Sequence, residues 1–236
     1  MTTTERSAGD LRRLAEQGAA ELDQASATDI LRWVDDNFGP DGWVVSSSMQ
    51  DAVLVDVATR VREDVNVMFI DTGYHFPETI GTRDAVATVY PHIRLLNAQP
   101  PTTVAEQDRL EGKDLFARDP NRCCAIRKVA PMRETLGKFD AWVTGLRRAE
   151  AATRANAPAV AFNEKFGVVK INPLVTWTDE QTDRYIAQNA ILINPLIEDG
   201  YPSIGCRTCT VKPAPGADPR SGRWAGTGKV ECGLHG

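Results

Sequence analysis

The stretch "VNVMFID", residues 65–71, is apolar along most of its length and ends on an acid, which predicts a buried strand. Three other stretches predict further strands: "WVVSSS" (43–48), "IRLLNA" (93–98) and "DAWVTGL" (140–146). Helices are expected between these strands, over about 51–62, after Pro77 and over about 123–138. The alternation predicts an α/β protein with a mostly parallel, twisted sheet flanked by helices on both faces. In such a sheet, ligands bind beyond the carboxyl ends of the strands.

The two ends of the chain differ from this core. Apolar spacing predicts helices over 10–24 and 28–37, and a later helix over 178–189 begins with acids, as the helix dipole favours. Residues 200–236 hold eight of the 18 glycines and four of the 14 prolines, which indicates an irregular, movable C-terminal tail. We therefore expect three parts: flanking helices over 1–40, an α/β core over 41–199 and a flexible C-terminal segment over 200–236.

The composition is that of a globular protein without a membrane span. The chain has 236 residues, 42% of them hydrophobic and 25% charged, and neither a long apolar run nor a signal-peptide pattern is present. We therefore expect a cytoplasmic protein that has no membrane partner. The net charge of -5 disfavours nucleic acid as a partner, although a local basic patch could receive a small anion.

Five cysteines in a reducing compartment favour metal, cluster or catalytic use over disulfides. "NRCCAIRK" (121–128) sets two of them side by side, Cys123 and Cys124, and "GCRTC" (205–209) spaces Cys206 and Cys209 so that both sulfurs can face one metal centre. Four thiolates suit zinc or an iron–sulfur cluster, and adjacent ligands favour the cluster because it offers separate iron atoms. The alternative is that the first pair is buried packing and the second a redox pair.

Several groups could receive an anion. "SSSMQD" (46–51) joins a predicted strand end to a helix start, where backbone N–H groups favour an anion, although a capped helix explains the stretch equally well. Guanidinium forks fit sulfate and phosphate oxygens, whereas each one alone is most simply a solvated surface charge. The candidates for binding an anion are Ser46, Ser47, Ser48, Lys128, Arg147, Arg148, Arg220 and Arg223.

Two further motifs carry candidate chemistry. In "DTGYHFPET" (71–79), Asp71, with Thr72 and Gly73 after it, could hold a ribose or cap the turn. In the terminal "ECGLHG" (231–236), Cys232 is the fifth cysteine and His235 follows it, so a basic neighbour could lower the pKa of a nucleophilic thiol. His75 and His92 are expected to be structural.

Five stretches, in their order along the chain, resemble the assimilatory adenylyl-sulfate (APS) reductases, relatives of the PAPS reductases. These stretches are "RCCAIRKV", "TGLRR", "GCRTCT", "GRWAG" and "ECGLHG", and the resemblance runs from about residue 44 to the C-terminus. It implies an adenine-nucleotide alpha-hydrolase-like core that binds the nucleotide, with "SSSMQD" where pyrophosphatase relatives bind ATP phosphates. One departure is Met49, where relatives often carry glycine.

The resemblance also implies the cofactor and the roles of residues. Cys123, Cys124, Cys206 and Cys209 would hold a 4Fe-4S cluster. Lys128 would link the cluster to the substrate, and Arg148, Arg220, Arg223 and His235 would contact the phosphosulfate or stabilise the thiolate. Cys232 would attack the sulfur of adenosine 5'-phosphosulfate and release AMP, after which thioredoxin would attack Cys232 and release sulfite.

Three alternatives stay open at this point. A PAPS reductase would keep the fold and use the 3'-phosphorylated nucleotide. An ATP-dependent adenylating enzyme has less support because a glycine-rich pyrophosphate loop is missing from "SSSMQD". A non-enzymatic redox sensor would hold the cluster and need no nucleotide pocket. Association with further copies of the chain is left open.

Overall fold

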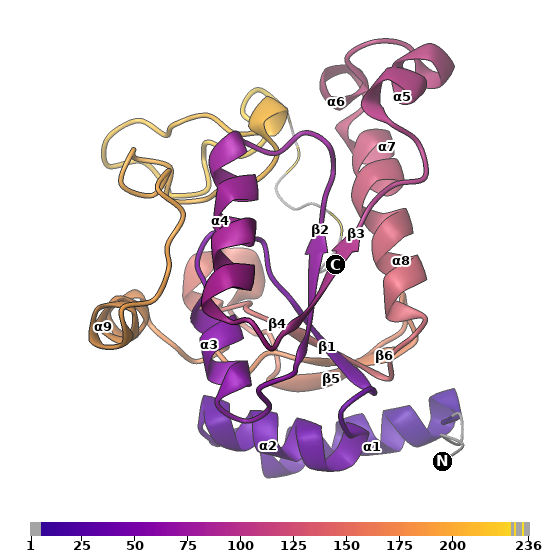
Figure 1. The fold of residues 1–236 in the computed structure, drawn as a ribbon, viewed down its shortest axis with the longest axis vertical. Helices are drawn as coiled ribbons and strands as arrows, with labels where there is room; N and C mark the ends of the chain where they lie inside the picture. The colour runs from indigo at the N-terminus through magenta and orange to yellow at the C-terminus, as the bar shows by residue number, and fades with distance from the viewer. Residues whose placement is uncertain (1–5, 228, 230–232, 234–236) are drawn as a thin grey trace.

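The centre of the protein is a six-stranded sheet in the order β3-β2-β1-β4-β6-β5 (Figure 1). The structure is a computed structural model that describes residues 6–227, 229 and 233. All neighbouring strands run parallel except β5 and β6, which form an antiparallel pair. The strands are β1 (Trp43–Ser46), β2 (Asn66–Ile70), β3 (Arg94–Ala98), β4 (Ala141–Thr144), β5 (Val160–Asn163) and β6 (Val168–Ile171).

Helices cover both faces of this sheet. In Figure 1, α3 and α4 lie on one side of the strands and α8 on the other, and in both views α1 and α2 lie below the sheet. The helices are α1 (Ala8–Glu21), α2 (Ala27–Phe38), α3 (Val53–Thr59), α4 (Pro77–Val89), α5 (Val104–Glu111), α6 (Leu115–Arg118), α7 (Pro120–Cys124), α8 (Ala130–Leu136) and α9 (Asp179–Asn189). A π-helical turn (Ala125–Val129) joins α7 to α8, and short 3-10 turns occur at Arg148–Glu150, Ala152–Arg154 and Arg207–Cys209.

Adjacent residues of the central strands point into two separate apolar layers. Val45 belongs to the larger layer, which α2 and α3 cover, whereas its neighbour Val44 belongs to a smaller layer with Met132 and Leu136 of α8. All four side chains are fully buried. A strand whose two faces are both covered must be apolar at every position, which is why the parallel strands appear in the sequence as continuous apolar runs.

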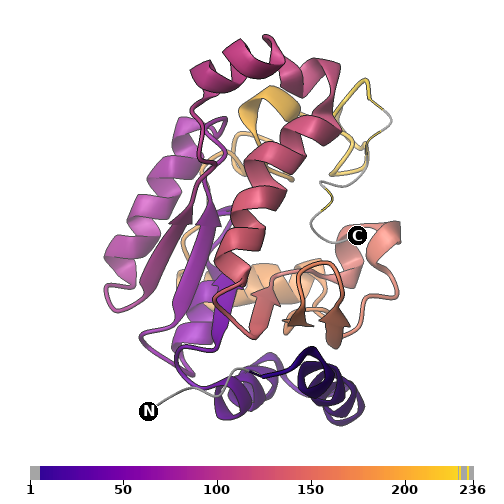
Figure 2. The same cartoon turned by 90° about the vertical axis from the view of Figure 1, so that its right-hand side faces the viewer.

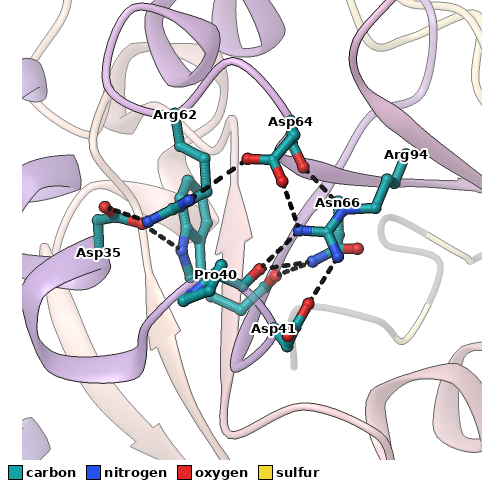
Figure 3. Close-up of polar contacts among 8 residues, drawn as sticks. Asp35, Pro40, Asp41, Arg62, Asp64, Asn66 and Arg94 are labelled. Atoms are coloured by element: carbon teal, nitrogen blue, oxygen red, sulfur yellow. Dashed lines mark hydrogen bonds and ion pairs between the residues drawn. The ribbon is translucent and has the colours of Figure 1, made fainter.

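A polar network ties together the amino ends of the first three strands (Figure 3). The Arg94 guanidinium contacts Asp41 at 2.6 Å and Asp64 at 3.1 Å, which joins the start of β3 to the loops before β1 and β2. Asp35 of α2 accepts a bond from Trp43 Nε1 at 3.1 Å and pairs with Arg62. These bonds fix the sheet at the edge opposite the candidate site.

The sequence-based fold class is confirmed, and so are the four predicted strands and the helices before β1 and after Pro77. The β5–β6 hairpin was not predicted. The expected helix over 123–138 is interrupted by the π-helical turn, which ends just before Pro131 near the start of α8. Proline has no N–H and its ring crowds the carbonyl four residues earlier, so a wider turn there relieves the clash. Among the described residues, no helix is both long and apolar enough to cross a membrane.

Candidate functional site

A large cavity opens at the carboxyl edge of the sheet, where the chain order reverses between β1 and β4. Its volume is about 760 Å³, which suits a nucleotide-sized ligand. The wall contains the serines after β1, the loop after β4 and the C-terminal segment. Of the predicted anion-binding groups, the cavity brings together Ser46, Ser47, Ser48, Lys128, Arg147, Arg148, Arg220 and Arg223.

The serine loop leaves β1 in a conformation fixed by its own hydrogen bonds. Ser46 Oγ accepts a bond from Trp142 Nε1 at 2.8 Å, and Ser47 Oγ accepts one from the Met49 amide at 3.2 Å. Met49 has a φ of 57°, in the left-handed region that glycine adopts without strain. The buried Asn194 holds this turn by donating to the Met49 carbonyl at 3.1 Å. Met49 therefore holds a backbone conformation that favours glycine, and burial and the Asn194 bond keep it there.

The arginines after β4 are held by protein acceptors. Arg147 donates to Asp179 at 2.7 Å and lies 3.8 Å from Glu150, so two carboxylates already share its charge. Arg148 Nε donates to the Ala157 carbonyl at 2.8 Å. Arg154, which our sequence analysis missed, also lines the cavity and pairs with Glu150. A single arginine in a 3-10 turn gives no sequence signal, and only the folding back of the loop brings it to the cavity.

All four predicted cofactor cysteines line one small cavity beside the large one. Cys123 and Cys124 come from α7 and are 7% and 6% exposed, and Cys206 and Cys209 come from the 206–209 turn. Burial, together with the three other thiols, raises the pKa of Cys123 to about 12. The three other thiols are thus close enough to Cys123 to oppose its ionisation, and a positive metal centre would favour the thiolate form.

The π-helical turn buries two adjacent cations next to these thiols. Arg127 is 3% exposed and donates to the Thr72 carbonyl, to Gln107 Oε1 at 3.1 Å and to the Thr102 carbonyl at 3.2 Å. Lys128 is 9% exposed and lines both the cysteine cavity and the large cavity. Lys128 therefore lies between the two cavities, where one charge can act on groups in both.

The "DTGY" turn after β2 packs against the second cysteine pair. Thr72 lines both cavities, and its Oγ1 lies 3.3 Å from Cys206 Sγ. Asp71 and Gly73 line neither cavity. Asp71 accepts from the Gly73 amide at 3.0 Å and from Gln99 at 3.0 Å, and although burial opposes it, these bonds keep the pKa of Asp71 lowered. Asp71 therefore caps its turn in this structure, and its proposed ribose contact has no geometric support.

His75 is built into the wall of the large cavity. Its Nε2 lies 2.8 Å from the Ile70 carbonyl, so Nε2 carries the proton and donates. Burial lowers the pKa of His75, and the nearby positive charge of Lys128 lowers it further. The ring is therefore neutral in the folded protein at pH 7, which agrees with a structural role. Cys232 and His235, the predicted nucleophile and its neighbour, lie outside the described residues.

The cysteine cavity fits an iron–sulfur cluster by the chemistry of its donors. Four thiols from two segments face one space, with Lys128 and Arg127 to offset the negative charge of an iron–thiolate centre. No group of three or more candidate ligands in the described part of the chain is arranged to hold a single metal ion.

The mostly parallel sheet and the cavity at its switch point place the protein in the class of open, twisted α/β folds. An FMN adenylyltransferase from Candida glabrata, solved with FAD and inorganic pyrophosphate, shares the fold with a TM-score of 0.57 at 12% identity, over 86% of this chain and 74% of that one. A phosphoadenylyl-sulfate (PAPS) reductase from Candida auris, in a phosphate complex, aligns with a TM-score of 0.72 at 26% identity, over 88% of this chain and 99% of that one.

Sequence comparison narrows the class to one family. The phosphoadenosine phosphosulfate reductase domain matches residues 42–212, and the chain belongs to that family. An adenosine 5'-phosphosulfate reductase from Rhodococcus erythropolis is 60% identical over 97% of this chain and 96% of its own length. One from Mycolicibacterium smegmatis is 61% identical over 99% of this chain and 97% of its own length.

Proposed function

We propose that this protein reduces adenosine 5'-phosphosulfate to sulfite and AMP in sulfate assimilation, in the cytoplasm, with thioredoxin as the reductant. The main support is the near-full-length similarity, at about 60% identity, to proteins named adenosine 5'-phosphosulfate reductase. The geometry agrees, because a nucleotide-sized cavity with basic walls adjoins four gathered thiols.

The substrate would lie in the large cavity with its phosphosulfate toward the basic wall. Four arginines of the cavity wall can offer N–H donors to the oxygen atoms of the phosphosulfate. Arg148 and Arg154 belong to the loop after β4, and Arg220 and Arg223 belong to the C-terminal segment. Arg147 is engaged by two carboxylates, so its part is to hold this loop in place. Lys128 would contact the sulfate end, because it is the cation that borders both cavities. Ser46, Ser47 and Ser48 would face the nucleotide.

Cys123, Cys124, Cys206 and Cys209 would hold a 4Fe-4S cluster. The bound cluster would hold the two cysteine segments and the adjacent Lys128 in a fixed arrangement, and no change in its oxidation state is required. The positive charge of Lys128 would then act on the sulfate, where preorganised charge stabilises the transition state. Thr72 would stabilise the 206–209 turn through its contact with Cys206.

Cys232 would supply the nucleophile. Its thiolate attacks the sulfur of the substrate, the bond from that sulfur to the phosphate oxygen of AMP breaks, and AMP leaves from an S-sulfocysteine. One thiolate of thioredoxin then attacks the Cys232 sulfur and sulfite leaves with the bonding electron pair. The second thioredoxin thiol resolves the mixed disulfide, so two thiols are oxidised and the substrate sulfur gains two electrons. His235 is assigned to stabilising the thiolate.

Anaerobic turnover tests the proposed function. The purified protein should release sulfite and AMP from adenosine 5'-phosphosulfate when thioredoxin, its reductase and NADPH are present, and it should do neither when thioredoxin is omitted. Absence of sulfite with a fully loaded protein would refute the activity.

The same assay separates the two nucleotides. The Candida auris structure and the family name point to the 3'-phosphorylated substrate, whereas the more similar relatives carry the name of the unphosphorylated one. We expect kcat/KM to be higher for adenosine 5'-phosphosulfate. Preference for the 3'-phosphorylated nucleotide would assign the protein as a PAPS reductase.

A further inference from the structure

We propose that the phenol of Tyr74 donates a hydrogen bond to the sulfur shell of the cluster, on the side of Cys123, and thereby adjusts the electronic state of the cofactor. The inference rests on the proposed 4Fe-4S site. It concerns a residue that the cluster ligands do not include and that our sequence analysis left without a role.

Tyr74 is part of the wall around the four thiols. It lines the cysteine cavity, and its backbone carbonyl accepts a bond from the Arg207 amide at 2.7 Å, inside the turn that carries Cys206 and Cys209. Its own amide donates to Thr72 Oγ1 at 3.2 Å. The backbone of Tyr74 is therefore bonded directly to the 206–209 turn, which carries two of the four cysteines.

The ring of Tyr74 is also held in place. It meets Phe116 of α6 edge to face, with 5.5 Å between ring centroids, and the Arg127 guanidinium lies 5.5 Å from the ring centre. Both contacts are of kinds that favour a defined ring geometry and therefore restrict the orientation of the ring. The hydroxyl is thus presented at a defined point.

That hydroxyl is buried and has no hydrogen-bond partner among the described residues. Burying a hydroxyl without a hydrogen bond is unfavourable, so a partner for this group is expected in the cluster-loaded protein. Two candidates are near. One is the carboxylate of Asp108, whose Oδ1 is also buried without a partner in the described chain, and the other is the sulfur of Cys123, which lines the same cavity as Tyr74. A water between Tyr74 and Asp108 is the competing arrangement.

The cluster favours the sulfur side. Cys123 lines the same cavity as Tyr74, and a protonated thiol is only a weak acceptor. Ligation converts it to a thiolate, a strong acceptor, while a phenol with an ordinary pKa of about 10 keeps its proton at neutral pH. A donor at a cluster sulfur withdraws electron density from the iron and raises the reduction potential.

The test compares Tyr74→Phe with wild type after both are loaded with cluster anaerobically. Phenylalanine keeps the ring contacts and removes only the hydroxyl. We expect equal iron and sulfide per chain, a lower midpoint potential, and Fe–S(Cys) stretching bands at higher frequency in resonance Raman spectra. The matched control is Tyr185→Phe, which removes a phenol that bonds to Asp56 at 2.5 Å and lines neither cavity, and it should leave both readouts unchanged.

Wild type alone gives a second readout. Exchange into D₂O should shift Fe–S(Cys) bands, and this shift should diminish in Tyr74→Phe. Identical bands and potential in the two proteins at equal iron content would overturn the inference and favour the water at Asp108. Absence of iron and sulfide from wild type would instead refute the proposed cofactor, so the two failures are distinguishable.

Discussion

Arg127 links the fold to the candidate site, and replacing it by methionine should be costly. The guanidinium is almost fully buried and reaches three neutral acceptors on two segments: the Thr72 carbonyl after β2, and the Thr102 carbonyl and Gln107 Oε1 at the start of α5. Arg127 therefore joins the ligand-bearing helix to the turn that contacts Cys206.

The magnitude follows from the acceptors left behind. Arg127→Met keeps most of the hydrocarbon volume and removes the donors, and each buried acceptor left unpaired costs about 1–3 kcal/mol. Loss of the desolvation cost of the guanidinium offsets part of this, and we expect a net loss of about 2–4 kcal/mol in the free energy of unfolding.

Urea unfolding followed by tryptophan fluorescence measures this loss, with an unchanged m-value as the check that the unfolding reaction is the same. Iron per chain should also fall in Arg127→Met. Arg109→Met is the control, because Arg109 is exposed and reaches Glu106 only at 4.0 Å; it should change stability by about 0.5 kcal/mol or less. If Arg127→Met matched this control in stability and iron content, the reasoning would be refuted.

Three further predictions concern pH, scaffold and chemistry. The unfolded chain takes up a proton at His75 below about pH 6.5 while the folded chain resists it, so stability should fall with decreasing pH by at most about 1.4 kcal/mol per unit. His75→Gln should flatten that dependence in urea titrations at pH 5.5 and 7.5, whereas the exposed His92→Gln should leave it unchanged. Asp35→Ala should cost about 1–3 kcal/mol of stability and leave turnover per folded molecule unaltered. Lys128→Met should lower kcat/KM for the substrate by about 10²-fold at constant iron content, and a change below twofold would contradict its placement between the cavities.

The fold could be predicted because the buried parallel strands are themselves the signal. "VNVMFID" is apolar on both faces because α3 and α8 cover both faces of the sheet. The β5–β6 hairpin lacks this signal. Its strands have four residues each, β5 lies at the edge of the sheet, and Lys170 and Asn163 break the apolar pattern.

Site residues could be predicted where they stand in a sequence motif or at a strand end. They could not be predicted where only the folded chain brings them to the site. The paired cysteines and the arginines after β4 follow from residue type and strand ends, and the structure brings them to adjoining cavities. Arg154 and Tyr74 gain their positions from a loop that folds back and a turn that packs on the 206–209 segment. Asp71 is the opposite case. Its place at a strand end suggested a ligand contact, whereas its carboxylate accepts a hydrogen bond from Gly73 within its own turn.

The central claim is that four cysteines serve the cofactor while Cys232 alone carries the sulfonate. Intact-mass spectrometry tests it after the anaerobic protein is mixed with adenosine 5'-phosphosulfate and no reductant. Wild type should gain the mass of one sulfonate group, located by peptide mapping at Cys232, and Cys232→Ser should gain none while retaining its iron. A sulfonate on the Cys232→Ser protein, or on one of the other four cysteines of wild type, would contradict the account.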